Sequence, residues 1–133
     1  MPSSRALIVD RDSDFAERLD RCLCLLGFTV EIVDNRREAL ESLRADGAEF
    51  VFIAVERPKK TGFKVFTDVK RLARNVPIVL ASSTVPMDEL LMHQKLRLHA
   101  DAYVDKRGLS DRKILDTLND LSKVFICYCR VDG

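Results

Sequence analysis

Short apolar runs alternate along this chain with longer amphipathic segments, and this alternation constrains the fold more than any other feature of the sequence. The short runs, which are typical of strands, cover residues 6–9, 28–33, 50–55, 77–81 and 102–104. In the longer segments the apolar residues recur three or four positions apart, as on one face of a helix. Strands that alternate with helices imply βαβ units, so the pattern predicts a parallel sheet with right-handed crossovers.

Start and stop signals place the helices between these strands. Asp14 followed by Glu17 predicts the start of the first helix and Gly27 its end, and Asn35 followed by Glu38 predicts the start of the second. The pattern as a whole predicts a flavodoxin-like (βα)5 three-layer sandwich with a five-stranded parallel sheet of order 2-1-3-4-5. In this fold a site is expected at the carboxyl ends of the first and third strands. The remaining helices are expected within residues 63–72, 86–99 and 110–121.

The length of 133 residues suits one domain with one core. We expect this domain to span residues 5–121. The apolar segment 122–133 is interpreted as a tail that extends the last helix, covers a hydrophobic patch or pairs with a second copy in a homodimer, or as the start of a linker. Hydrophobic residues make up 47% and charged residues 32% of the chain, as in globular rather than disordered proteins.

The charge balance and the hydropathy exclude several kinds of partner. A net charge of +1 predicts no attraction to nucleic acid or to an anionic membrane. No apolar run approaches the roughly 20 residues of a bilayer span. The first residues lack the apolar stretch of a signal peptide, so a cytoplasmic location is expected.

Neither the cysteines nor the histidines predict a metal centre. Residues two positions apart do not share a helix face, and no histidine lies near either Cys-x-Cys pair, so free thiols are favoured over a soft-metal or disulfide site. His93 and His99 are six residues apart and are interpreted as ordinary surface or rim residues. No Gly-rich phosphate loop is present. The four cysteines are Cys22, Cys24, Cys127 and Cys129.

The third apolar run ends at Ala54, which lies four residues before Pro58 and eight before Gly62. This layout resembles the third strand and following loop of a response-regulator receiver (CheY-like) domain, and the resemblance covers roughly residues 5–121. In that family the residue at this position is the aspartate that accepts a phosphoryl group. A methyl group has no lone pair with which to act as that nucleophile. The resemblance therefore implies a non-catalytic pseudo-receiver, not an enzyme.

Receivers also hold Mg²⁺ with an acidic pair just after the first strand, and here the matching positions are Asp10 and Arg11. Magnesium requires oxygen ligands. One charge pair at 4 Å is worth about 4 kcal/mol at an effective dielectric near 20, so a guanidinium in place of a carboxylate should weaken binding by orders of magnitude. We expect no cofactor, with Mg²⁺ binding lost or very weak. Asp12 would substitute only in part, and we expect it to cap the first helix.

Three further positions match the family. Ser82 follows the fourth strand where receivers have the Ser or Thr that responds to the phosphoryl group, and Lys106 follows the fifth, where the family lysine contacts phosphoryl oxygens. Tyr103 falls at the family's aromatic switch position. The lysine is normally followed by a cis-proline, but Arg107 stands here, so this loop is expected to run differently.

These substitutions change the charge of the predicted pocket. Asp10, Arg11 and Lys106 sum to +1, or to zero if Glu56 also points inward. Because an unpaired buried lysine is costly, we expect Lys106 to bridge Asp10, with Arg11 meeting Glu56 or solvent. Two interpretations stay open: the charges only hold the old pocket shut, or a cationic pocket binds an anion such as a phosphorylated ligand.

Residues 93–104 resemble the corresponding stretch of a pseudo-receiver from bacterial gliding motility that also has alanine at the acceptor position. The resemblance implies a two-component signalling module that contacts a protein partner without phosphorylation. The expected surface comprises the fourth helix, fifth strand and fifth helix. The alternatives are a receiver phosphorylated on another carboxylate, above all Asp10, and a small-molecule or anion sensor. The partner, the pathway and the oligomeric state stay open. The candidate partner residues are Lys95, Arg97, Tyr103, Asp105 and Arg107.

Overall fold

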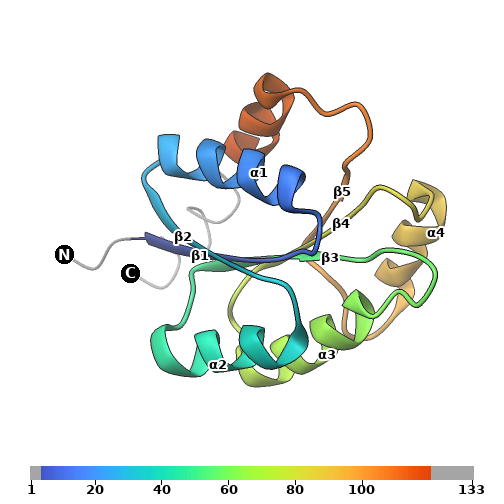
Figure 1. Ribbon diagram of the computed structural model, residues 1–133. Helices are drawn as coiled ribbons and strands as arrows, with labels where there is room; N and C mark the ends of the chain where they lie inside the picture. Colours follow the sequence, from blue (N-terminus) through green and yellow to red (C-terminus); the bar gives the residue numbers. More distant parts are fainter. Residues whose placement is uncertain (1–3, 121–133) are drawn as a thin grey trace.

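A computed structural model describes residues 4–120 of the chain as a single parallel sheet with helices on both faces (Figure 1). The strand order is β2-β1-β3-β4-β5, which confirms the predicted topology. The predicted tail, residues 122–133, lies outside the described residues, as do Cys127 and Cys129. The strands are β1 (Ser4–Val9), β2 (Phe28–Val33), β3 (Phe50–Ala54), β4 (Ile78–Ser82) and β5 (Ala102–Asp105).

The helices begin and end largely where the sequence signals place them. Asp12 caps the first helix by accepting a hydrogen bond from the backbone N–H of Phe15, and Asn35 caps the second through Glu38. The first helix ends before Gly27, whose φ of 93° is a conformation that glycine adopts without strain. The helices are α1 (Ser13–Leu25), α2 (Arg36–Asp46), α3 (Gly62–Leu72) and α4 (Met87–Leu91); residues 111–120 form a last helix.

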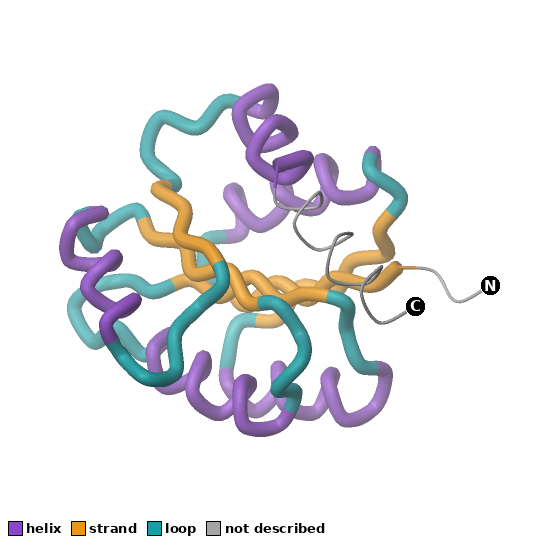
Figure 2. Tube along the Cα trace, turned by 180° about the vertical axis from the view of Figure 1, so that it is seen from behind, coloured by secondary structure: helices purple, strands orange, loops and turns teal. Residues whose placement is uncertain are grey.

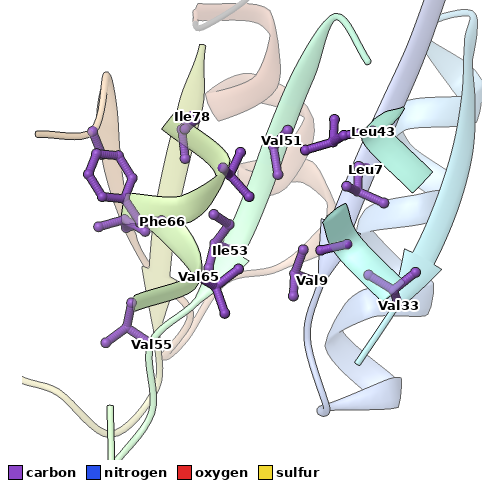
Figure 3. Close-up of a cluster of buried hydrophobic side chains, with 14 of the residues drawn as sticks. Leu7, Val9, Val33, Leu43, Val51, Ile53, Val55, Val65, Phe66 and Ile78 are labelled. Atoms are coloured by element: carbon purple, nitrogen blue, oxygen red, sulfur yellow. The ribbon is translucent and has the colours of Figure 1, made fainter. Parts of the chain in front are cut away.

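Each face of the sheet packs on its own set of helices. In Figure 1, α1 and the last helix cover one face, and α2 and α3 cover the other. The tube in Figure 2 shows the same layers from behind. Successive residues of β1 alternate between the two cores: Leu7 lies in the α2–α3 core, and Ile8 in the core under α1. Figure 3 shows part of the α2–α3 core, where Phe66 of α3 lies near Ile78 of β4.

The helix expected within residues 86–99 is present but shorter than that range. It comprises α4, which ends at Leu91, and a 3-10 turn, Met92–Lys95. We expected this helix to contain Leu96 and Leu98, but both lie beyond its end and are 55% and 46% exposed. Because neither leucine is buried, no apolar face holds a longer helix against the sheet.

Among residues 4–120, no helix combines the length and apolar character that a bilayer crossing requires. In the same part of the chain, no cluster of three or more His, Cys, Asp or Glu side chains is placed to hold a metal ion. Cys22 is buried and Cys24 exposed, and both are free thiols.

Candidate functional site

A compact polar cluster lies at the carboxyl ends of the strands. Asp10 follows β1, and its N–H donates to the carbonyl of Val33 at the end of β2 at 2.9 Å. Ser82 ends β4, and Lys106 follows β5, where its N–H donates to the Ser82 carbonyl at 2.9 Å. Because these strands are parallel, their ends meet at one edge of the sheet. The fold therefore brings together residues that are far apart in the sequence.

Lys106 lies between two carboxylates and is almost completely buried. Its Nζ is 2.8 Å from Oδ2 of Asp10 and 2.7 Å from Oε2 of Glu56, and its side chain is 2% exposed. The expected bridge to Asp10 is therefore present. Burial works to lower the pKa of Lys106, but the bonds to the two carboxylates outweigh it and raise the pKa. The lysine thus stays charged inside the protein.

Glu56, two residues beyond the end of β3, is the most heavily bonded carboxylate of the cluster. Its Oε1 accepts from Ser82 Oγ at 2.9 Å, from the Ser83 N–H at 3.0 Å, and from Thr84 through both N–H (3.1 Å) and Oγ1 (2.7 Å). Its Oε2 accepts from Lys106 and from Ser83 Oγ at 3.0 Å. These bonds point Glu56 into the pocket.

The two carboxylates of the cluster differ in their acidity. Burial works to raise the pKa of Glu56, but the bonds from Lys106, Thr84 and Ser83 prevail and lower it to about 2. Asp10 is only 7% exposed, and burial raises its pKa despite its bonds to Lys106 and to the Asp12 N–H. The negative charge of the pocket is therefore held most firmly on Glu56.

Ala54, which the sequence analysis matched to the position of the receiver nucleophile, ends β3, and its side chain offers no polar atom to the cluster. The start of α3 packs directly against its backbone. A Cβ added to Gly62 would lie 2.1 Å from the carbonyl oxygen of Ala54, closer than two atoms can approach. The glycine is therefore required for the close approach of α3 to the end of β3.

Arg11, which the sequence analysis matched to the second acid of receivers, does not enter the pocket. The residue is exposed, and its Nε donates to the backbone carbonyl of Asp34 at 3.3 Å. We expected Arg11 to meet either Glu56 or solvent, and it lies in solvent. Since Glu56 does point inward, the buried charges are those of Asp10, Glu56 and Lys106, a formal sum of −1. The pocket is therefore not cationic. It would have been cationic, with a sum of +1, if Arg11 had pointed inward and Glu56 outward.

His93 is placed differently from the prediction. We interpreted it as a surface or rim residue, but it is buried, stacked on Phe63 and edge-on to Phe66 at centroid distances of 5.1 and 4.8 Å. Its Nδ1 lies 3.1 Å from the hydroxyl of Tyr103, and burial lowers its pKa. His93 lies three residues after buried Leu90, a helical spacing that would have placed it on the inner face. His99 is exposed, as predicted.

The candidate partner residues differ in their exposure. Lys95, Arg97 and Arg107 are exposed, whereas Tyr103 and Asp105 are partly buried. Arg107 forms a two-pronged ion pair with Asp105, at 2.9 and 3.0 Å. Large apolar side chains are exposed beside these charges, a feature of contact surfaces that the sequence analysis did not use. They are Leu91, Met92, Leu96 and Leu98.

Sequence reasoning also missed the residues that hold the pocket from outside. Ser83 and Thr84, the polar residues after β4, supply most of the bonds to Glu56, and a polar Ser-Ser-Thr run after a buried strand was the available signal. Glu89 of α4 forms ion pairs with Arg57 and Lys60. No spacing in the sequence brings these three residues together, because the loop after β3 meets α4 only in the folded chain.

Comparison with known proteins places this architecture. The family model described as the response regulator receiver domain matches residues 6–119. The chain is 31% identical over 104 residues to the transcriptional regulatory protein PrrA of Mycobacterium tuberculosis, covering 78% of the chain and 44% of that protein. It is 32% identical over 113 residues to the CpxR homolog of Haemophilus influenzae, covering 84% of the chain and 47% of that protein. The chain thus spans about half the length of these curated relatives.

A solved structure shares the fold at low sequence identity. The CheY-like receiver domain protein from Methanospirillum hungatei superposes with a TM-score of 0.79 at 18% identity, covering 96% of this chain and 99% of that one. Strand order, site position and family match agree, and on these grounds the chain belongs to the response regulator receiver domain family.

Proposed function

We propose that this domain is a pseudo-receiver, a signalling module of two-component systems that works through protein contacts without being phosphorylated. The observation that carries the proposal is the pair of changes at one site. Ala54 stands where the family has its nucleophile, and the pocket beside it is closed by the bonds among Lys106, Asp10 and Glu56. Ala54 removes the nucleophile, and the bonds among the three charged residues leave no free cation for a phosphoryl group.

The same geometry disfavours magnesium, the family's metal. Both oxygens of Asp10 are already engaged, one by Lys106 and the other by the N–H of Asp12 at 2.9 Å. Arg11 points away and would bring a positive charge, and Ala54 has no oxygen in its side chain. Magnesium binds through carboxylates and water in a near-ideal octahedron, so these residues do not fit it. We infer that Mg²⁺ binding is lost or very weak.

The proposed partner surface is formed by α4, β5 and the last helix. It combines exposed Lys95 and Arg97 with the exposed leucines beside them and with Tyr103 at its edge. Aromatic and arginine side chains surrounded by apolar area are the usual anchors of protein interfaces. We infer a protein partner in a bacterial signalling pathway. For this domain we infer no nucleic-acid partner, although the relatives are named transcriptional regulators.

We also infer that the domain is not an enzyme. Within residues 4–120 both histidines have partners away from Ser82: His93 contacts Tyr103, and His99 contacts the carbonyl of Leu96. Nucleophilic catalysis by a serine needs a base within hydrogen-bond reach. Glu56 does contact Ser82, but the low pKa of this carboxyl makes it a weak base.

A thermal unfolding experiment with Mg²⁺ plus beryllofluoride, a mimic of the phosphoryl group, tests the proposal. The unmodified chain is compared with an Ala54→Asp, Arg11→Asp double variant, with and without Glu56→Ala. We expect no change in the melting temperature of the unmodified chain and an increase for a restored variant, since binding to the folded state stabilises it. A comparable increase for the unmodified chain would overturn the proposal.

Phosphorylation at Asp10 is the main alternative. Incubation with acetyl phosphate followed by intact-mass measurement should give no adduct, because Asp10 is buried and both its oxygens are bonded. An adduct mapped to Asp10 would favour this alternative. A role in motility, a cytoplasmic location and a homodimer formed through the last helix and tail rest on the sequence alone and stay predictions.

A further inference from the structure

Positive charge is concentrated in one segment of this nearly neutral chain. Residues 57–74, which comprise α3 and its flanking loops, contain seven lysines or arginines and one acidic residue, a net charge of +6. The whole chain has a net charge of +1, so all other residues together sum to −5. The overall balance therefore conceals a strongly basic region. Its cations are Arg57, Lys59, Lys60, Lys64, Lys70, Arg71 and Arg74.

Most of these cations have no carboxylate of their own. Arg57 and Lys60 form ion pairs with Glu89. Within residues 4–120 the other five cations form no ion pair. We call these five the basic strip; a partner can neutralise them without first breaking a bond inside the protein. The exposed members are Lys59, Lys64, Arg71 and Arg74, and the partly buried member is Lys70.

The single acidic residue of the segment is already neutralised from outside it. Lys64, Asp68 and Arg71 follow one another at spacings of four and three residues, so they share one side of α3. The side chain of Asp68 is only 16% exposed and forms an ion pair with Arg36 of α2. The bond from Arg36 lowers the pKa of Asp68, and the nearby charges of Lys64 and Arg71 lower it further. One turn beyond Asp68, Leu72 is 41% exposed and adds apolar area to the same side.

We propose that the basic strip, with Leu72 beside it, binds an acidic segment of a partner protein, a stretch rich in Asp and Glu. Complementary charge steers such a segment to the strip and selects against other partners. The strip is narrow, because α2, which packs beside α3 (Figure 1), carries three arginines and three acidic residues and so has no net charge. A membrane or a DNA duplex would lie across α2 as well and gain no attraction there. A single chain segment can lie along α3 alone.

This surface goes beyond the proposed function, since it uses neither the Lys106 pocket nor the surface formed by α4, β5 and the last helix. The test titrates the labelled chain with a synthetic peptide of alternating Leu and Asp or Glu residues, and backbone amide signals are followed by NMR. The control peptide has Asn and Gln in place of the acids. We expect saturable shifts within residues 57–74 for the acidic peptide alone, with an affinity that falls as salt is added.

Two double variants with the same change in net charge assign the binding to the strip. Lys64→Glu, Arg71→Glu reverses two charges within it and should weaken peptide binding at least about tenfold. Arg21→Glu, Arg112→Glu is the matched control and should change the affinity by less than about twofold. Arg21 and Arg112 are exposed cations of α1 and the last helix, which cover the other face of the sheet. An equal loss in both variants would overturn the proposal, because net charge alone would then explain the binding.

Further outcomes decide the class of partner. Phosphatidylglycerol vesicles and a short DNA duplex are titrated in the same way. If either binds through residues 57–74 while the acidic peptide gives no saturable shifts, the proposed protein partner is overturned. Absence of peptide binding, or shifts confined to amides outside residues 57–74, also overturns it. If the charge-reversed strip variant does not fold, Lys64→Gln, Arg71→Gln replaces it; a severalfold loss of affinity then supports the proposal, and an unchanged affinity overturns it.

Discussion

Two glutamates of this domain have the same kinds of partner but very different surroundings. Glu56, at the carboxyl ends of the strands, accepts from Lys106 and Ser82, and Glu31, in β2, accepts from Arg5 and Ser42. The side chain of Lys106 is 2% exposed, against 20% for Arg5. In addition, two backbone N–H groups of the loop after β4 donate to Glu56.

The difference shows how burial distinguishes two ion pairs made of similar residues. Arg5 also donates to the carbonyl of Gly47 at 2.9 Å, so the Glu31 cluster ties β1 and β2 to the end of α2. At Glu56 the donors come from a loop and a buried cation that also has Asp10 as a partner. Removing Glu31 leaves a partly exposed arginine, whereas removing Glu56 takes a partner from a lysine whose side chain is almost fully buried.

The largest difference in stability between the two clusters is expected when the cation of each cluster is replaced. Lys106→Met leaves Asp10 and Glu56 facing each other without compensation, and breaking a buried ion pair typically costs about 3–5 kcal/mol. Arg5→Met should cost only about 1 kcal/mol, because its partners stay hydrated. Urea unfolding measures both losses through the midpoint and the slope. Equal losses would show that the burial of Lys106 does not matter.

Replacing each glutamate by glutamine sharpens the comparison at constant shape. Glu56→Gln loses several charge-assisted bonds and places an amide NH2 among donors, so the free energy of unfolding should fall by about 2–3 kcal/mol. Glu31→Gln, with a side chain 40% exposed, should lose about 1 kcal/mol or less. Urea unfolding measures the loss in the free energy of unfolding for both variants. A larger loss for Glu31→Gln would break the distinction between the two clusters.

Acidification should remove the contribution of the Glu56 carboxylate to the stability of the folded protein. Its pKa is about 2 in the folded protein against an ordinary value of 4.5, so its contribution to stability is full above about pH 5 and is lost as the pH falls toward about 2. With a side chain 29% exposed, the loss is about 2 kcal/mol after allowance for solvent screening. Asp10 and Lys106 face this carboxyl, and the raised pKa of Asp10 acts in the opposite direction.

The stability of the unmodified chain and of Glu56→Gln, measured by urea unfolding from about pH 7 to pH 3, isolates this contribution. The gap between the two curves should narrow as the solution is acidified. Glu31→Gln serves as the control and should give a smaller and flatter gap, since its neighbours are more exposed. A gap for Glu56→Gln that stays constant with pH would mean that charge does not carry the stabilisation.

The sequence predicted the strand order and the pairing of Lys106 with Asp10, but it did not predict the direction of the Glu56 side chain. Strand order follows from the βα alternation, and the pairing of Lys106 with Asp10 follows because both residues end parallel strands at one edge. Glu56 lies beyond the end of its strand, so strand periodicity does not fix its direction. Its inward orientation depends on the N–H groups of Ser83 and Thr84, which loop geometry positions.

The length of the helix within residues 86–99 was overestimated for a similar reason. Leucine spacing alone favoured a long helix, but a helix needs a surface on which to bury its apolar face. The structure buries Leu90 and His93 there and leaves Leu96 and Leu98 exposed. His93 was interpreted as a surface or rim residue because its six-residue spacing from His99 does not suit a helical metal site, although its spacing from Leu90 matches the buried face. Packing against Phe63 and Phe66 decided its position.

The smallest effect is expected at an ion pair with no buried component. Asp105 and Arg107 form good two-pronged geometry, but their side chains are 36% and 49% exposed. Arg107→Ala should therefore leave the free energy of unfolding nearly unchanged and leave the acid profile of Glu56 intact. If this loss matched that of Lys106→Met, charge pairing alone would explain the pocket. A small loss instead assigns the strength of the Glu56 cluster to burial and to the backbone N–H groups that surround it.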